Sequence, residues 1–444
     1  MRTKYLVATA ISVFAIAAIS CSSGDATATP DIPATVTPTT APQNFTVAFS
    51  NKKRIESPNV PASDLEQLAT DNNTFALDLY RQLATDNSKN LFMSPYSISL
   101  ALAMTYAGAN GDTATEMADT LHFNLPDSRL HAAFNELDRL LAARGADLPA
   151  DQKFTLNIAN SIWGQQGFDF EPAFLDTLAE NYGAGMRLLN YSQQAEIARQ
   201  TINQWIEDNT QGRIKDLIPQ GAIDEQTVLV LANAIYFKAA WAREFDPGLT
   251  ARGDFHTLKN GTVKADMMNQ TSTFNFADAD GYTAIEVPYV GQQTSMVVLV
   301  PDEGKFTSFE SSLDAATLVQ IMNGMSYTNV ELKFPKFSYK SKFTLPQPLK
   351  DLGMRKAFDP FEADFSGMRT PPPSLVITDV IHQAFVAVDE QGTEAAAATA
   401  VIVGTKSIAP DPVRLTVDRP FIYLFRDVPT NTILFTGRVL NPAE

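Results

Sequence analysis

The sequence predicts a folded unit of mixed α and β structure. Apolar residues recur at helical intervals through the first half of the chain, for example over 174–182 and 196–207. Strand-like apolar runs dominate the second half, for example over 295–300 and 421–425. About 380 residues follow position 62 without a Gly/Ser-rich linker that would divide them, which is enough for one unit with a large core.

Residues 1–20 are predicted to be an export signal. Two basic residues precede an apolar run from Tyr5 to Ile19, which is shorter than a membrane-spanning helix requires. The only cysteine follows, and 18–21 resembles a bacterial lipobox, although that pattern prefers Leu where Ala18 stands. The resemblance implies that Cys21 is lipidated and holds an exported protein at the cell surface or periplasmic face. The alternative is a plain secretory signal, an inert thiol and a secreted protein.

Residues 21–62 are predicted to be a lipidated amino terminus and a flexible linker. From Ser22 to Pro42 the chain is mostly Thr, Ala and Pro, and it lacks the apolar residues that offset ordering entropy. The basic run 52–54 is interpreted as a solvated cluster, with contact to anionic lipid as the alternative.

The folded domain is predicted to span residues 63–444. Ser63 and Glu66 have the spacing of a capping box, in which the two side chains satisfy backbone donors at the start of a helix. Apolar residues at helical intervals follow at Phe75, Leu79 and Leu83.

A second helix is predicted to start at Ser94 and Pro95, since Ser favours the N-cap position and Pro the first turn. These two residues belong to a series of short segments that resemble motifs of one protein family, in the family's order. The segments are Asn90–Ser99, Gly108–Thr113, Asn203–Trp205, Thr210–Gly212, Leu231–Lys238 with Trp241 just after, Glu331–Phe337, Asp364–Gly367, His382, Arg419–Phe421 and Phe435–Val439.

The segment Val388–Ser407 is the most informative part of the chain. It follows a stretch, 374–388, that alternates like a long strand, and it is small and β-branched without any of the 26 prolines. With period two, one face is small or apolar and the other begins at Glu394. That first face holds Thr393, Ala395, Ala397, Thr399, Val401 and Val403. The segment is therefore predicted to be a loop that can become a strand; an Ala-rich helical turn is the alternative.

Together these segments resemble the serpins, the serine protease inhibitor family, from about Phe75 to Pro442. The resemblance implies three β-sheets, eight or nine helices and a reactive loop exposed at one pole. It implies a reactive bond between Lys406 and Ser407, fourteen residues after the hinge glycine. The hinge that it implies is Glu390, Gly392, Thr393, Glu394, Ala395, Ala396, Ala397, Ala398 and Thr399.

The resemblance also implies a mechanism. A protease cuts after Lys406 and forms an ester to its own serine, and the segment from Gly392 then enters the central sheet before water can release the ester. About fourteen residues at ~3.3 Å each span roughly 45 Å, so the enzyme is carried to the opposite pole. Distortion of its oxyanion hole then stalls deacylation.

Lys406 predicts a trypsin-like serine protease as the target. Cleavage after Val403 or Thr405 would instead suit an elastase-like or subtilisin-like enzyme, and inhibition of cysteine proteases is a further alternative. A non-inhibitory serpin-fold binding, storage or chaperone protein usually has bulky, charged or Pro residues in the hinge, which cannot be buried in the sheet, and the inward face of this hinge has none.

His382 lies in an alternating apolar stretch, so it is predicted to be buried and to need hydrogen-bond partners. The resemblance implies that these partners are Asn233, Ser94 and Ser97, a polar cluster beneath the central sheet that controls its opening. It also implies that Trp241 marks the breach of this sheet.

The net charge of −16 argues against nucleic-acid binding. Heparin binding is not expected either, because acidic residues offset the arginines of the helix predicted over 128–144. We find no Gly-x-Ser-x-Gly elbow, His-Glu-x-x-His pair, phosphate loop or cysteine cluster, so the sequence predicts neither an enzyme nor a cofactor or metal site. A single cysteine excludes an internal disulfide. The expected partners are a target protease, as an acyl complex, and a membrane through Cys21, with the protein itself a monomer.

Overall fold

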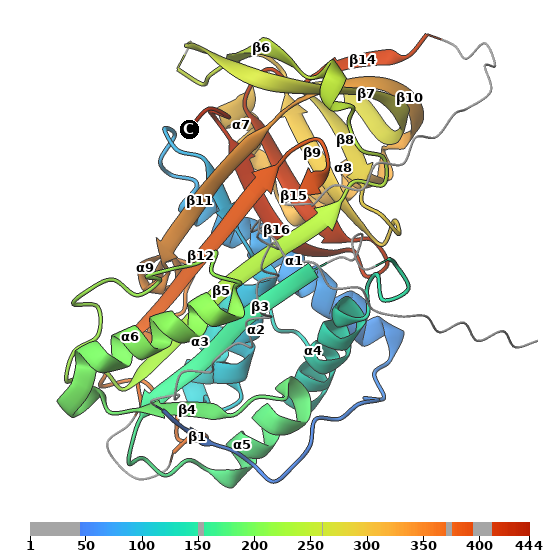
Figure 1. Ribbon diagram of the computed structural model, residues 1–444. Helices are drawn as coiled ribbons and strands as arrows, with labels where there is room; N and C mark the ends of the chain where they lie inside the picture. Colours follow the sequence, from blue (N-terminus) through green and yellow to red (C-terminus); the bar gives the residue numbers. More distant parts are fainter. Residues whose placement is uncertain (1–44, 150–154, 260, 370–374, 394–410) are drawn as a thin grey trace, which may run out of the picture. The chain divides into compact units, whose positions relative to one another are not determined.

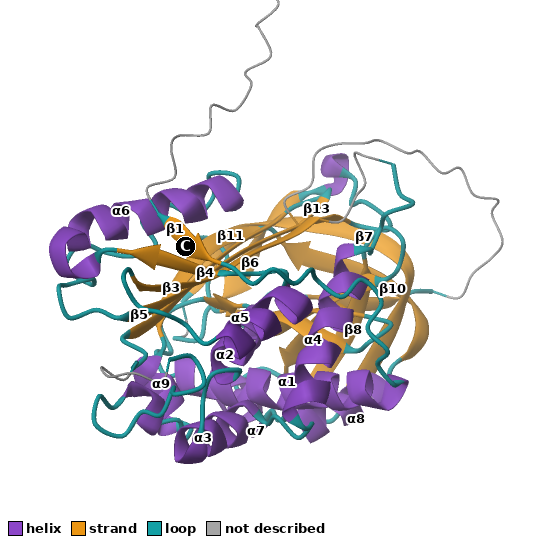
Figure 2. Ribbon diagram, turned by 90° about the horizontal axis from the view of Figure 1, so that it is seen from below, coloured by secondary structure: helices purple, strands orange, loops and turns teal. Residues whose placement is uncertain are grey.

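The computed structural model describes residues 45–149, 155–259, 261–369, 375–393 and 411–444 (Figure 1). Within these ranges, nine α-helices pack around two β-sheets (Figure 2). The predicted mixed α and β class is confirmed. Within the same ranges, no helix is long and apolar enough to cross a membrane.

The central sheet has seven strands. Their order is β1 (Thr46–Ala48), β4 (Met186–Leu189), β3 (Thr155–Gln165), β5 (Leu229–Ala240), β13 (Gly392–Thr393), β12 (Asp379–Val388) and β11 (Phe337–Thr344). Strand β5 pairs antiparallel with β3 and parallel with β12. Helix α6 (Tyr191–Asn209) covers one face of the sheet, where its Ile202 and Ile206 belong to one buried apolar cluster with Ala232 and Ala234 of β5.

The second sheet has nine strands. Their order is β14 (Val413–Thr416), β10 (Ser326–Pro335), β7 (Thr262–Ala279), β8 (Tyr282–Pro288), β9 (Thr294–Pro301), β15 (Phe421–Asp427), β16 (Thr432–Val439) and β2 (Leu91–Met93), with β6 (Ala251–His256) paired to β7. The 18-residue β7 pairs with β6 and β10 and, at its last five residues, with β8. It therefore joins the second and third sheets that the resemblance implied.

The remaining helices lie mostly on the other side of the central sheet from α6 (Figure 2). They are α1 (Ala62–Leu83), α2 (Pro95–Tyr106), α3 (Gly111–Leu121), α4 (Asp127–Ala142), α5 (Pro172–Thr177), α7 (Phe306–Ser312), α8 (Ala315–Asn323) and α9 (Pro346–Asp351). A π-helical turn, Leu178–Tyr182, continues α5, and 3-10 turns occur at Pro247–Leu249 and Lys356–Phe358.

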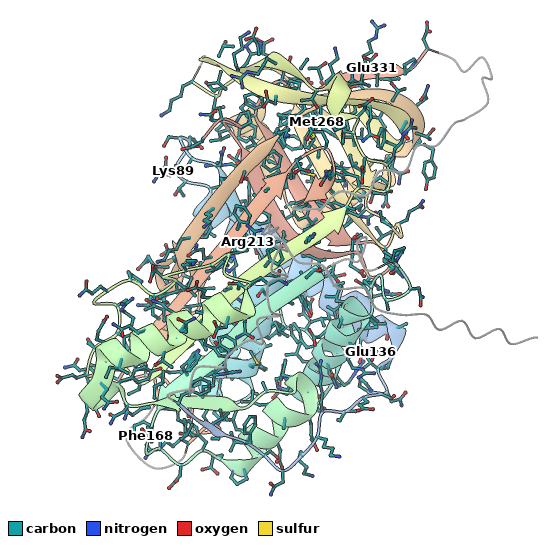
Figure 3. All side chains as sticks on the ribbon, in the orientation of Figure 1. Lys89, Glu136, Phe168, Arg213, Met268 and Glu331 are labelled. Atoms are coloured by element: carbon teal, nitrogen blue, oxygen red, sulfur yellow. The ribbon has the colours of Figure 1, made fainter. Side chains whose placement is uncertain are left out.

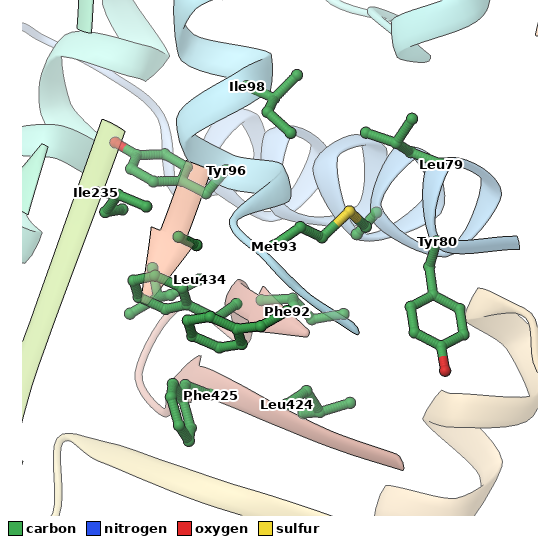
Figure 4. Close-up of a cluster of buried hydrophobic side chains, with 14 of the residues drawn as sticks. Leu79, Tyr80, Phe92, Met93, Tyr96, Ile98, Ile235, Leu424, Phe425 and Leu434 are labelled. Atoms are coloured by element: carbon green, nitrogen blue, oxygen red, sulfur yellow. The ribbon is translucent and has the colours of Figure 1, made fainter. Parts of the chain in front are cut away.

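The predicted start of α2 is confirmed. Pro95 is its first residue, and the Ser94 hydroxyl accepts a hydrogen bond from the N–H of Ser97 at 3.2 Å. Nearly every residue of α2 is buried, and part of the core that it helps to form appears in Figure 4. There Phe92 of β2 meets Phe425 of β15 edge-on, with ring centroids 5.8 Å apart.

The folded unit begins before the predicted boundary at residue 63. Strand β1 pairs antiparallel with β4, and Arg54 then reaches α4, where it contacts Asp138 at 2.6 Å and Asn135 at 2.8 Å. The interpretation of 52–54 as a solvated cluster is therefore wrong for Arg54. These contacts join residues far apart in the sequence, so composition alone does not reveal them.

Two local predictions also need correction. Helix α1 begins at Ala62 after Pro61, and no side chain caps it, so Ser63 and Glu66 do not form the predicted capping box. Strand β12 begins only at Asp379, although the buried Leu375 and Ile377 before it continue the apolar alternation.

Candidate functional site

The chain reverses directly after β12 and returns as β13 between β12 and β5. The N–H of Asp389 donates to the carbonyl of Gly392 at 3.0 Å and closes the turn. Thr393 then lies opposite Val388 on one side and Ala239 on the other. A Cβ atom at Gly392 would lie 2.1 Å from the carbonyl oxygen of Ala239, so a side chain there does not fit. Gly392 and Thr393 of the predicted hinge are thus already part of the central sheet.

Two stacked aromatic rings support the side chain of Thr393. The rings of Trp241 and Tyr289 are parallel within 5°, with centroids 4.6 Å apart. The Tyr289 hydroxyl is 2.7 Å from the Thr393 hydroxyl, and the indole N–H of Trp241 donates to the carbonyl of Asp389 at 2.9 Å. Each of the three residues is 1% exposed. The space at position 393 therefore suits a small side chain, and the Tyr289 hydroxyl offers that side chain a hydrogen-bond partner.

An ion pair holds the turn between β12 and β13. Lys336 Nζ contacts Glu390 Oε2 at 2.7 Å, and the Thr250 hydroxyl donates to Glu390 Oε1 at 2.8 Å. Burial alone would raise the pKa of Glu390, but the hydrogen bonds from Lys336 and Thr250 outweigh it and hold that pKa below its ordinary value. Glu390 is therefore ionised at neutral pH and is held by Lys336 and Thr250.

A buried polar cluster lies further along the same two strands. His382 of β12 and Asn233 of β5 are register partners, and their side chains are hydrogen-bonded through Nδ1 and Oδ1. His382 Nε2 lies 3.1 Å from the backbone nitrogen of Ser94. The Asn233 amide donates to Ser97 Oγ at 2.7 Å and to Asn160 Oδ1 at 2.6 Å. The cluster thus ties β5 and β12 to each other and to the start of α2.

The hydrogen bonds define the protonation state of His382. A backbone N–H can only donate, so Nε2 accepts from Ser94, and the proton of the neutral ring lies on Nδ1, where it is donated to Asn233. The side chain is fully buried, and desolvation lowers its pKa to about 3.

We expect acidification from pH 7 to pH 5 to destabilise the native fold through His382. The unfolded chain binds a proton at this residue near pH 6.5, whereas the folded protein does so only near pH 3. The contribution of neutral His382 to the free energy of unfolding is therefore complete above pH 6.5 and is lost as the pH falls. At pH 5 the free energy of unfolding is lower by about 2 kcal/mol. Urea denaturation at both pH values measures it.

His131 provides the control for this experiment, because burial also lowers its pKa, to about 4. A His131→Gln variant should retain the loss that His382 causes, and a His131→Gln, His382→Gln double variant should not. Equal pH dependence in the two variants would contradict the assignment.

The sequence analysis did not single out three residues that contact the predicted site residues, and for two of these the sequence carries a signal. Lys336 belongs to one of the family-like segments, and Asn160 is a polar residue within an apolar strand. Tyr289 gave no signal, because its partner Thr393 is 104 positions away. The Lys406–Ser407 bond, the hinge from Glu394 to Thr399, and Cys21 lie outside the described residues.

The fold and this site define a protein with a two-residue strand, β13, between β5 and β12 of its central sheet, and comparison with known proteins identifies the family. The model of the family described as Serpin (serine protease inhibitor) matches residues 70–442. An uncharacterized serpin-like protein of Thermococcus kodakarensis is 38% identical over 374 residues, which cover 84% of this chain and 85% of that protein. Human leukocyte elastase inhibitor is 35% identical over 388 residues, covering 85% of this chain and 100% of that protein.

Comparison with solved structures identifies the same family. The native crystal structure of the thermophilic serpin Tengpin matches with a TM-score of 0.77 and 27% identity, over 89% of this chain and 97% of that one. The chain belongs to the serpin family, and its relatives include proteins named as protease inhibitors.

Proposed function

We propose that this protein is an inhibitory serpin that traps a trypsin-like serine protease after cleavage between Lys406 and Ser407. The observation that carries the proposal is β13, which lies between β5 and β12 and pairs antiparallel with both. Beyond it, β5 and β12 pair directly over six residue pairs, from Asp379 with Val230 to Ala384 with Ile235. A longer inserted strand would separate β5 from β12 and pair with both, so that two ladders of backbone hydrogen bonds replace one.

The register of β13 can be continued without a shift. Partners of Thr393 on β12 and β5 differ by the same offset as the partners in the direct pairing of these strands. The inward-facing loop residues would then meet Val386 and Phe237 at Ala395, Ala384 and Ile235 at Ala397, and His382 and Asn233 at Thr399. The first two positions face buried apolar side chains, which suits alanine.

Thr399 would meet the polar cluster at the row where insertion separates His382 from Asn233. A threonine hydroxyl is both a donor and an acceptor. It can accept from His382 Nδ1 and donate to Asn233 Oδ1, which replaces the hydrogen bond that insertion breaks. The only polar residue among the inward positions from 395 to 403 thus falls where the sheet offers polar partners.

The chemistry follows from this rearrangement. The protease serine attacks the Lys406 carbonyl, the bond to Ser407 breaks, and the new amino terminus at Ser407 leaves. The ester that remains is normally hydrolysed by water. Insertion pulls on the acyl group, displaces the oxyanion from its hydrogen-bond donors and removes stabilisation that is worth about 3–4 kcal/mol per donor.

Incubation with trypsin, elastase, subtilisin and papain tests the proposal. We expect trypsin to form a complex that survives boiling in detergent. A complex with elastase or subtilisin alone would move the cleaved bond toward Val403 or Thr405, and one with papain alone would change the target to a cysteine protease. Cleavage of the loop by all four enzymes without any complex would contradict inhibition and favour a binding or chaperone role.

The proposal also includes a lipid anchor on Cys21 that holds the inhibitor on the outer side of a membrane. It is supported by the short apolar run before this cysteine and the Thr/Ala/Pro segment after it. A diacyl anchor buries two chains, enough for stable attachment. We expect Cys21→Ser to move the protein to the soluble fraction and leave inhibition unchanged. Equal membrane retention of the variant and the wild type would contradict the anchor.

A further inference from the structure

Strand β1 begins at the end of the central sheet where β5 also begins. Strand β3 is antiparallel to β5, β4 is parallel to β3, and β1 is antiparallel to β4, so β1 and β5 run in the same direction. One row of register partners crosses these strands at Val47, Arg187, Trp163 and Val230. Phe168, just beyond β3, marks this end of the sheet in Figure 3.

The captured protease would arrive at the same end. This step rests on the proposed function. Continuing the register of β13 puts Ile402 into the row of Val47 and Val230. Four strand spacings of about 4.8 Å separate Ile402 from Val47, which is about 19 Å. Lys406, which carries the acyl bond, lies four residues further, or about 13 Å along the strand.

We propose that the Thr/Ala/Pro segment between Cys21 and β1 is a spacer that must reach around the captured protease. A protease of about 230 residues has a radius of gyration of about 17 Å and is about 45 Å across. Its acylated serine would lie within about 25 Å of the residue where the chain enters β1. An anchored inhibitor therefore holds its captured protease on the side that faces the anchor.

The length of the segment agrees with this requirement. Cys21 lies 24 positions before Phe45, so the segment reaches at most about 80 Å, whatever its conformation. That exceeds the width of the protease. Removal of residues 28–39 would leave a reach of at most about 40 Å, which is less than that width.

Fluorescence energy transfer tests the geometry. In a Cys21→Ser background, a donor is attached at Thr46→Cys or at Arg243→Cys, two exposed positions near opposite ends of the central sheet, and the acceptor is on trypsin. With trypsin whose active-site serine is replaced by alanine, transfer should be strong from 243 and weak from 46. In the covalent complex with active trypsin it should be strong from 46 and weak from 243. Weak transfer from 46 in the covalent complex would overturn the proposal.

A second experiment tests the spacer without relying on lipidation in the cell. The thiol of Cys21, the only cysteine, is coupled to a maleimide phospholipid in phosphatidylcholine vesicles, for the wild-type chain and for the chain lacking 28–39. We expect the shortened chain to need several-fold more inhibitor per trypsin on vesicles and to match the wild type when uncoupled. Equal stoichiometry on vesicles would overturn the proposal. Failure of the uncoupled wild type to trap trypsin would instead overturn the proposed function.

Discussion

A Thr393→Arg variant should be cut after Lys406 but should release the protease instead of trapping it. The Thr393 side chain is 1% exposed and its hydroxyl meets Tyr289, so an arginine there would be a buried charge without a partner. Burying such a charge costs several kcal/mol. Because Thr393 is already in the sheet of the intact protein, the arginine would expel residues 392–393 from it, and their return would then become part of insertion. A barrier higher by about 3 kcal/mol slows insertion more than 100-fold, and hydrolysis of the ester then wins. Titration of inhibitor against trypsin measures the change.

The alternating pattern of the hinge supplies matched controls. Ala395 shares the inward face with Thr393, whereas Ala396 belongs to the outward face. Ala395→Arg should therefore behave like Thr393→Arg, and Ala396→Arg, with the same added charge, should still inhibit. If Thr393→Arg traps protease as well as Ala396→Arg does, trapping does not require the face of the hinge that holds Thr393 to enter the sheet.

A Lys406→Ala variant should inhibit trypsin-like proteases more slowly by orders of magnitude. The specificity pocket of such enzymes holds a buried carboxylate, and loss of the lysine leaves that charge unpaired. The second-order rate of inhibition measures the effect.

Mass spectrometry of the released carboxyl-terminal peptide identifies the bond that is cut. The peptide should begin at Ser407. A peptide that begins at Gly404 or Lys406 would assign cleavage after Val403 or Thr405 and remove the reason for trypsin-like specificity, while Lys406→Ala would then have little effect.

Local signals predicted much of the fold. Ser94 and Pro95 define the start of α2, because capping and proline preference act over a few residues. Apolar alternation located β12, although β12 starts later than expected, and a continuous apolar run located β15. The polar cluster around His382 followed from the family resemblance, and the structure brings its four residues together.

Long-range pairing was not predictable in the same way. Strand β1 has only three residues, and its partner β4 lies about 140 positions away, so no local pattern indicates it. The contact between Tyr289 and Thr393 has the same cause. That Gly392 and Thr393 are already paired in the sheet also depends on the separation of β5 and β12, which a sequence does not specify.

Thermal unfolding of the intact and the loop-cleaved protein tests the central claim most directly. If cleavage frees the loop to insert, about ten residues gain a second ladder and bury apolar side chains, a gain on the order of 10 kcal/mol. The melting temperature of the cleaved wild type should then rise by more than about 10 °C, and that of cleaved Thr393→Arg should rise far less. A cleaved wild type that melts at the temperature of the intact protein would contradict loop insertion.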